Sequence, residues 1–292
     1  MSKGDLKLWG ILNEKLDLLR STGQLTEALR VAETALELAE RAFPAGDSGV
    51  ALSLEKIGQL HDQSGDRGAA KPYLERAHAM LTQTNPRDQR AVYRSARRLA
   101  FVCDSLGQGG EAVRYYDEAI DAGAQLPDLP HSELGTMLNN IALIYRGSDQ
   151  PAAAEPYYLR ALDLYQKQLG PEHRDVAAVL NNLAVFYTNQ QRFAEAEQMH
   201  LRALSIREKT QPARPADIAQ SKCNLAVVYH SLRNFERAAE LYRSSLEQWE
   251  KASPTPPADY DILVSNYADL LRTTGKDRQA QQLETRARKR RR

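Results

Sequence analysis

The side chains best suited to catalysis or metal binding are scattered along this sequence. Its six histidines show no HExxH pattern and no other paired metal spacing, and no nucleophile is arranged beside them. The two cysteines, Cys103 and Cys223, have no further ligand at metal-binding spacing. We therefore predict that the protein is not an enzyme, has no catalytic residue, cofactor or metal site, and keeps its thiols free.

Basic and amide side chains form the patterns that are suited to binding. On one helix face Arg90, Arg94, Arg97 and Arg98 would form a basic stripe, and Lys56 occupies the equivalent position one repeat interval earlier. Asparagines recur at two adjacent positions, as Asn139, Asn140, Asn181, Asn182, Asn224 and Asn266. Guanidinium forks suit carboxylates and phosphates, and an amide both donates and accepts hydrogen bonds. Apart from Arg90, these residues are the ten candidate binding residues.

Small side chains recur at intervals of 42 residues, and they indicate the elements that carry these candidates. Alanine occupies one position in all seven intervals, as Ala28, Ala70, Ala112, Ala154, Ala196, Ala238 and Ala280. A second series lies seven residues further on, with Ser245 as its exception, and a third lies twelve residues before the first. Helices cross closely where small residues recur, so the sequence predicts seven repeats of two helices each.

The residues around these series favour helices over strands. The segments LNNIALIY and LNNLAVFY place apolar residues at i, i+3, i+4 and i+7, which is the spacing of an amphipathic helix. One turn position between the paired helices holds Gly23, Gly65, Gly107 and Gly275 in four repeats, and Asp149, Gln191 and Arg233 in the other three.

The order of residue types within one interval resembles the tetratricopeptide repeat. It reads apolar, small, tyrosine, alanine, aromatic, alanine, as in Ile141, Ala142, Tyr145, Ala154, Tyr158 and Ala161. The 42-residue length is similar to the repeats of kinesin light chains and related bacterial proteins. This resemblance implies an all-α, right-handed α-solenoid in which the first helix of each repeat lines a concave groove. It also implies that the matching asparagines contact the backbone of a bound peptide.

We divide the chain accordingly. Residues 1–8 are expected to lead into a single solenoid over 9–290, and the basic end at 286–292 overlaps its last helix. The predicted repeats span 9–48, 49–90, 91–132, 133–174, 175–216, 217–258 and 259–290.

The expected function is that of an adaptor or scaffold holding a peptide or helix of a partner protein in the groove. The basic stripe favours a ligand that is acidic or carries a free C-terminal carboxylate. Two alternatives apply to the candidate residues: the asparagines set the stacking of neighbouring repeats, or acidic residues such as Glu55, Asp62 and Asp104 pair the arginines. Two other functions are a structural, self-assembling subunit, and a regulator that binds a polyanion through the basic end.

The charge pattern and the apolar runs restrict the partners. The residues from Arg286 to Arg292 hold six positive charges, while the whole chain has a net charge of only +1, so the remainder is at −5. A mildly acidic body disfavours nucleic acid in the groove. The chain has no apolar run near the roughly 18 residues of a membrane span. Its start, MSKGDLKLWGILNEKLDLLR, lacks the features of a secretory signal, so we predict a cytoplasmic protein.

Overall fold

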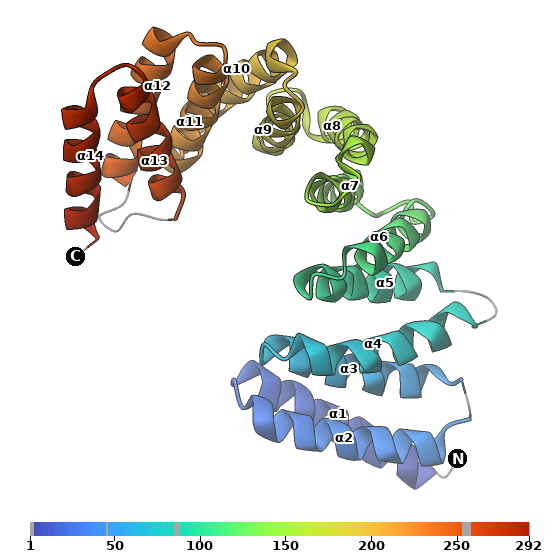
Figure 1. The fold of residues 1–292 in the computed structure, drawn as a ribbon. Helices are drawn as coiled ribbons and strands as arrows, with labels where there is room; N and C mark the ends of the chain where they lie inside the picture. Colours follow the sequence, from blue (N-terminus) through green and yellow to red (C-terminus); the bar gives the residue numbers. More distant parts are fainter. Residues whose placement is uncertain (1–2, 45, 85–87, 253–257, 292) are drawn as a thin grey trace. The chain divides into compact units, whose positions relative to one another are not determined.

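A computed structural model describes residues 3–44, 46–84, 88–252 and 258–291 (Figure 1). These residues form fourteen α-helices and one short 3₁₀ helix, without a strand, which confirms the all-α prediction of seven two-helix repeats. No helix among them is long and apolar enough to cross a membrane. The chain divides into two compact units, Met1–Pro151 and Ala152–Arg292, which we describe separately.

Within its described residues, the first unit contains seven α-helices: α1 (Lys3–Ser21), α2 (Leu25–Ala42), α3 (Ser48–Gln63), α4 (Arg67–Thr82), α5 (Gln89–Ser105), α6 (Gly109–Gly123) and α7 (His131–Arg146). The first helix begins before Trp9, where the first repeat was expected to begin. Trp9 ties α1 to later helices, since its indole Nε1 donates to Ser53 Oγ at 3.0 Å and its ring centroid lies 5.2 Å from that of Phe43.

After the 3₁₀ helix η1 (Pro151–Ala153), the described part of the second unit contains seven α-helices: α8 (Ala154–Leu169), α9 (Arg174–Asn189), α10 (Phe193–Lys209), α11 (Pro215–Ser231), α12 (Phe235–Ala252), α13 (Ala258–Thr273) and α14 (Asp277–Arg290). The division between the units falls between α7 and α8, the two helices expected for the repeat at 133–174.

The alanine series forms the tightest part of the packing. All seven alanines from Ala28 to Ala280 are 0% exposed. The exception in the second series, Ser245, is also fully buried, and its hydroxyl donates to the Ala219 carbonyl at 2.6 Å, so burial leaves no unpaired polar group. In the third series a β-carbon added to Gly58 would lie 2.6 Å from Leu74 Cγ. Within each unit, the paired helices therefore approach each other at these positions as the sequence predicted.

The turn between paired helices requires a left-handed residue in six of the seven repeats. The four predicted glycines have φ between +73° and +86°, and the non-glycine residues Gln191 and Arg233 adopt +58° and +59°. The turn of the fourth repeat is built differently: Asp149 lies in the turn, as predicted, but does not have a positive φ. There Gly147, the residue that caps the C-terminus of α7, has φ −88°, and Ser148 Oγ accepts a hydrogen bond from the Gln150 amide at 3.1 Å.

Replacing Gln191 and Arg233 by glycine should stabilise the protein. The left-handed conformation costs a side-chain-bearing residue about 1–2 kcal/mol, whereas glycine adopts it freely. Part of that gain is lost to the greater freedom of glycine in the unfolded chain. We expect Gln191→Gly and Arg233→Gly each to raise the free energy of unfolding by about 0.5–1 kcal/mol in urea denaturation. Gly65→Ala should lower it, and a stabilising effect of that change would contradict the explanation.

The aromatic position of the repeat holds an isolated histidine in α10. His200 is 1% exposed, and neither ring nitrogen has a hydrogen-bond partner among the described residues. Neighbouring repeats place Tyr158 and Tyr242 at the same position. Burial, and to a smaller extent the positive charge of Arg207, lowers the pKa of His200 to about 3. The side chain is therefore a neutral packing group in the folded protein.

His200 should make the protein less stable in mild acid. The unfolded chain has an ordinary histidine pKa of 6.5, so it binds a proton as the pH falls from 6.5 towards 3, whereas the folded chain does not. The free energy of unfolding thus declines over that range. We expect His200→Phe to remove about 1–2 kcal/mol of this decline between pH 7 and pH 5, measured by denaturant unfolding. If the free energy of unfolding of His200→Phe fell between pH 7 and pH 5 by as much as that of the unaltered protein, this role would be ruled out.

The basic end of the chain belongs to the last helix. Arg286 and Arg290 of α14 both contact Glu250 of α12, with an Arg286 Nη2 to Glu250 Oε2 distance of 2.5 Å. Arg291 pairs with Asp261, and Ala287 is buried. Part of the positive charge is therefore neutralised within the second unit, while Arg292 lies outside the described residues.

Candidate functional site

The first unit has a groove of about 780 Å³ on the surface formed mainly by α1, α3, α5 and α7. It brings together five of the ten candidate residues: Lys56, Arg94, Arg97, Arg98 and Asn140. The other side chains lining the groove are Asp17, Arg20, Leu52, Glu55, Gln59, Asp62, Gln63, Phe101, Tyr116, Glu133, Thr136 and Met137. The first helices of successive repeats thus contribute most of this surface.

Two of the candidate cations in the groove are paired within the protein. Lys56 Nζ lies 3.0 Å from Asp17 Oδ2 of α1, and Arg97 Nη1 lies 2.9 Å from Glu133 Oε2 of α7. Glu133 also accepts a hydrogen bond from the Tyr93 hydroxyl. These pairs join helices of neighbouring repeats, so Lys56 and Arg97 contribute to stacking whatever else they bind.

The other two candidate cations share one buried carboxylate. Glu55 is 9% exposed; burial raises its pKa, and the nearby Arg94 and Arg98 oppose that rise. Burial also lowers the pKa of Arg98, against the attraction of Glu55 and Asp62. Among the described residues neither arginine forms a direct ion pair or hydrogen bond, and Asp62 itself pairs with Arg67 at 3.2 Å. Positive charge therefore exceeds negative charge beside Glu55.

An exposed apolar surface adjoins these arginines. Phe101 is 46% exposed, and Leu52 is also exposed within the groove. The guanidinium of Arg67 lies 5.1 Å from the Phe101 ring centroid, so a cation lies against part of the exposed ring. Sequence analysis missed Phe101, although its spacing of seven residues from Arg94 and three from Arg98 places it on the same face of α5.

The six candidate asparagines are divided between the units and differ in their contacts. Asn139 and Asn140 lie on α7 of the first unit, where Asn140 Nδ2 donates to the Tyr116 hydroxyl at 3.2 Å. In the second unit Asn224 Nδ2 of α11 donates to Asn181 Oδ1 of α9 at 3.0 Å. Asn139 and Asn182 also have interaction partners in the protein. Asn266 on α13 has no hydrogen bond to another described residue.

The bond between Asn224 and Asn181 should contribute to stability. Asn181 is 5% exposed, so Asn224→Ala would leave its buried carbonyl oxygen without a donor. Such a loss costs about 1–3 kcal/mol. Asn266→Ala is the matched control, because it gains the same helix propensity without breaking a bond. We expect the first variant to unfold at lower urea concentration than the second, and equal midpoints would show that the bond adds nothing.

Nucleophile and metal chemistry finds little support in the described residues. Among them, no group of three or more histidine, cysteine, aspartate or glutamate side chains is arranged to hold a metal ion. Cys103 and Cys223 are free and buried, and burial raises the pKa of their thiols to about 11 and about 12. Both sulfurs are therefore protonated at neutral pH, and the reactive thiolate form is suppressed.

Several solved structures have a similar fold. The crystal structure of BtubC (BKLC) from P. vanneervenii is 27% identical, with a TM-score of 0.62 over 78% of this chain and 90% of that one. A putative kinesin light chain from Podosopora anserina with nearly identical TPR-like repeats is 20% identical, with a TM-score of 0.57 over 69% and 96%. The apo form of RapI is 13% identical, with a TM-score of 0.61 over 97% of both chains.

No curated protein matches the sequence. Family models described as tetratricopeptide repeats, however, match residues 12–83, 133–209 and 218–254. These ranges cover more than half of the chain and agree with the paired helices and buried alanines. The chain belongs to the tetratricopeptide repeat family.

Proposed function

We propose that this protein is an adaptor or scaffold whose groove in the first unit holds a short segment of a partner protein. Proteins of this family generally mediate protein–protein interactions and are typically scaffolds without catalytic activity. The observation that carries the proposal is the exposed ring of Phe101 beside Arg94 and Arg98, two guanidinium groups that share the buried carboxylate of Glu55.

The charge in the groove favours a carboxylate on the partner. A carboxylate placed beside Arg94 would find donors that no described side chain occupies, and guanidinium forks suit its planar geometry. Either an acidic side chain or a free C-terminus supplies that group. An apolar side chain next to it would cover Phe101 and Leu52, removing exposed apolar surface from water.

The asparagines are proposed to contact the backbone of the bound segment. Asn140 lines the groove with the arginines, and Asn139 precedes it on α7. The hydrogen bond from Asn140 Nδ2 to Tyr116 leaves the side-chain oxygen of Asn140 able to accept a hydrogen bond from a peptide amide. We extend the same role to the asparagines on the corresponding helix positions of the second unit, Asn181, Asn182, Asn224 and Asn266, where the bond between Asn181 and Asn224 also favours a part in stacking.

Binding through the basic end has less support. Arg286 and Arg290 contact Glu250, so a polyanion would have to compete with charges of the protein itself. A cytoplasmic location remains a prediction from the sequence.

Selection from random peptide libraries tests the proposal, with one library displaying free C-termini and one displaying internal segments. We expect enriched peptides to combine an acidic group with a neighbouring apolar residue. Arg94 is exposed, so Arg94→Gln should fold normally and weaken the selected peptide about tenfold in fluorescence anisotropy. Phe101→Ser should weaken it similarly.

The matched control is Arg243→Gln, which removes an exposed arginine from α12 in the other unit. It should leave the peptide affinity unchanged. Two results would refute this groove as the binding site: selected internal peptides that lack acidic residues, or selected peptides that bind Arg94→Gln and Phe101→Ser as tightly as the unaltered protein.

A further inference from the structure

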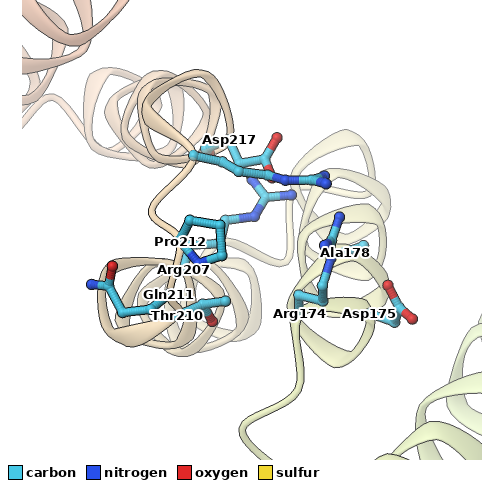
Figure 2. Close-up of a pocket in the computed structure, with 9 residues that line it drawn as sticks. Arg174, Asp175, Ala178, Arg207, Thr210, Gln211, Pro212 and Asp217 are labelled. Carbon is cyan, nitrogen blue, oxygen red and sulfur yellow. The ribbon is translucent and has the colours of Figure 1, made fainter. Parts of the chain in front are cut away.

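A second, smaller pocket lies in the second unit, between the start of α9 and the loop that follows α10 (Figure 2). Its volume is about 290 Å³. Three arginines from three segments line it: Arg174 opens α9, Arg207 stands in the last turn of α10, and Arg214 immediately precedes α11. Figure 2 shows Arg174 and Arg207 reaching into the gap from opposite walls.

Arg207 is held in place by neutral acceptors. Its Nη1 donates to the backbone carbonyl of Asp217 and to Ser221 Oγ, both at 2.8 Å. Burial lowers its pKa, and the negative charge of Asp217 opposes this only in part. No carboxylate among the described residues forms a direct ion pair with Arg207. A desolvated guanidinium without a counter-ion is costly, so this position favours an anion from outside the chain.

The carboxylates that line the pocket do not neutralise the three arginines. Asp175 is directed to the side of α9 away from Arg207 (Figure 2), and its Oδ2 lies 3.6 Å from His173 Nδ1. Asp217 contacts Arg207 through its backbone carbonyl. Neither Arg174 nor Arg214 has an ion pair or hydrogen bond to a described residue. The pocket lining therefore holds three guanidinium groups but only two carboxylates, and two of the guanidinium groups have all their donors available.

We infer that this pocket binds a phosphate group. Arginines that approach from three segments suit a tetrahedral anion, whose oxygens point in several directions, better than a planar carboxylate, which one fork can satisfy. Helices α9 and α11 also begin at the pocket, and the N-terminal ends of helices favour negative charge. The pocket is far larger than the roughly 15 Å³ needed for one water, so it has room for a phosphate ester as well as the free ion.

Calorimetric titration of the full chain with inorganic phosphate tests the inference, at fixed ionic strength in a chloride buffer. We expect saturable binding of one phosphate per chain, and no comparable binding of acetate. Titration with O-phospho-L-serine distinguishes the two sources of the group: equal or tighter binding indicates a phosphorylated ligand, and weaker binding indicates the free ion.

Exposed arginines of the pocket provide the variants. Arg174→Gln and Arg214→Gln should each weaken phosphate binding about tenfold or more without changing the circular dichroism spectrum. Arg243→Gln, at an exposed position of α12, should bind like the unaltered protein. The inference is overturned if no phosphate binds, if acetate binds equally well, or if both pocket variants keep full affinity.

Discussion

The close approach of paired helices at a series of buried alanines is the constraint on which the rest of this structure depends. Every alanine from Ala28 to Ala280 in that series is fully buried. A larger side chain would separate the helices, since even a β-carbon added to Gly58 would lie only 2.6 Å from Leu74 Cγ. Because the paired helices within each unit are held together at these small positions, the opposite face of the first helix of a pair is free to vary.

Side chains on that variable face have different roles in successive repeats. One position on it holds Lys56, Arg98, Asn140 and Asn224 in four of the repeats. Lys56 makes an ion pair with Asp17, and Asn224 bonds to Asn181, so both join neighbouring repeats. Arg98 instead faces a carboxylate that it shares with Arg94. Contacts that stack neighbouring repeats thus lie on the same surface as the proposed binding groove.

Ionisable groups removed from water are accommodated here in three ways. Glu55 is buried near Arg94 and Arg98, whose charges oppose the rise in its pKa that burial causes. His200 has no such partner, so its pKa falls until the ring is neutral in the folded state. Arg207 cannot readily lose its proton and has only neutral acceptors in contact. The pocket lined by Arg174, Arg207 and Arg214 therefore keeps a positive charge that the protein itself balances only in part.

The sequence alone determined the repeat, the helices, the buried alanine series and the left-handed turn residues. Each of these depends on spacing within one helix pair, and local steric limits then leave little choice. It also identified Arg94, Arg98 and Asn140, because their positions in the repeat assign them to one helix face. Only the tertiary structure decided which charges are paired: Glu133 lies 36 residues from Arg97, and Asp17 lies 39 from Lys56. It likewise revealed the exposure of Phe101 and the meeting of Arg174, Arg207 and Arg214. A 42-residue period specifies which positions face a neighbouring repeat, but the contacts made there depend on the side chains that packing brings together from different repeats.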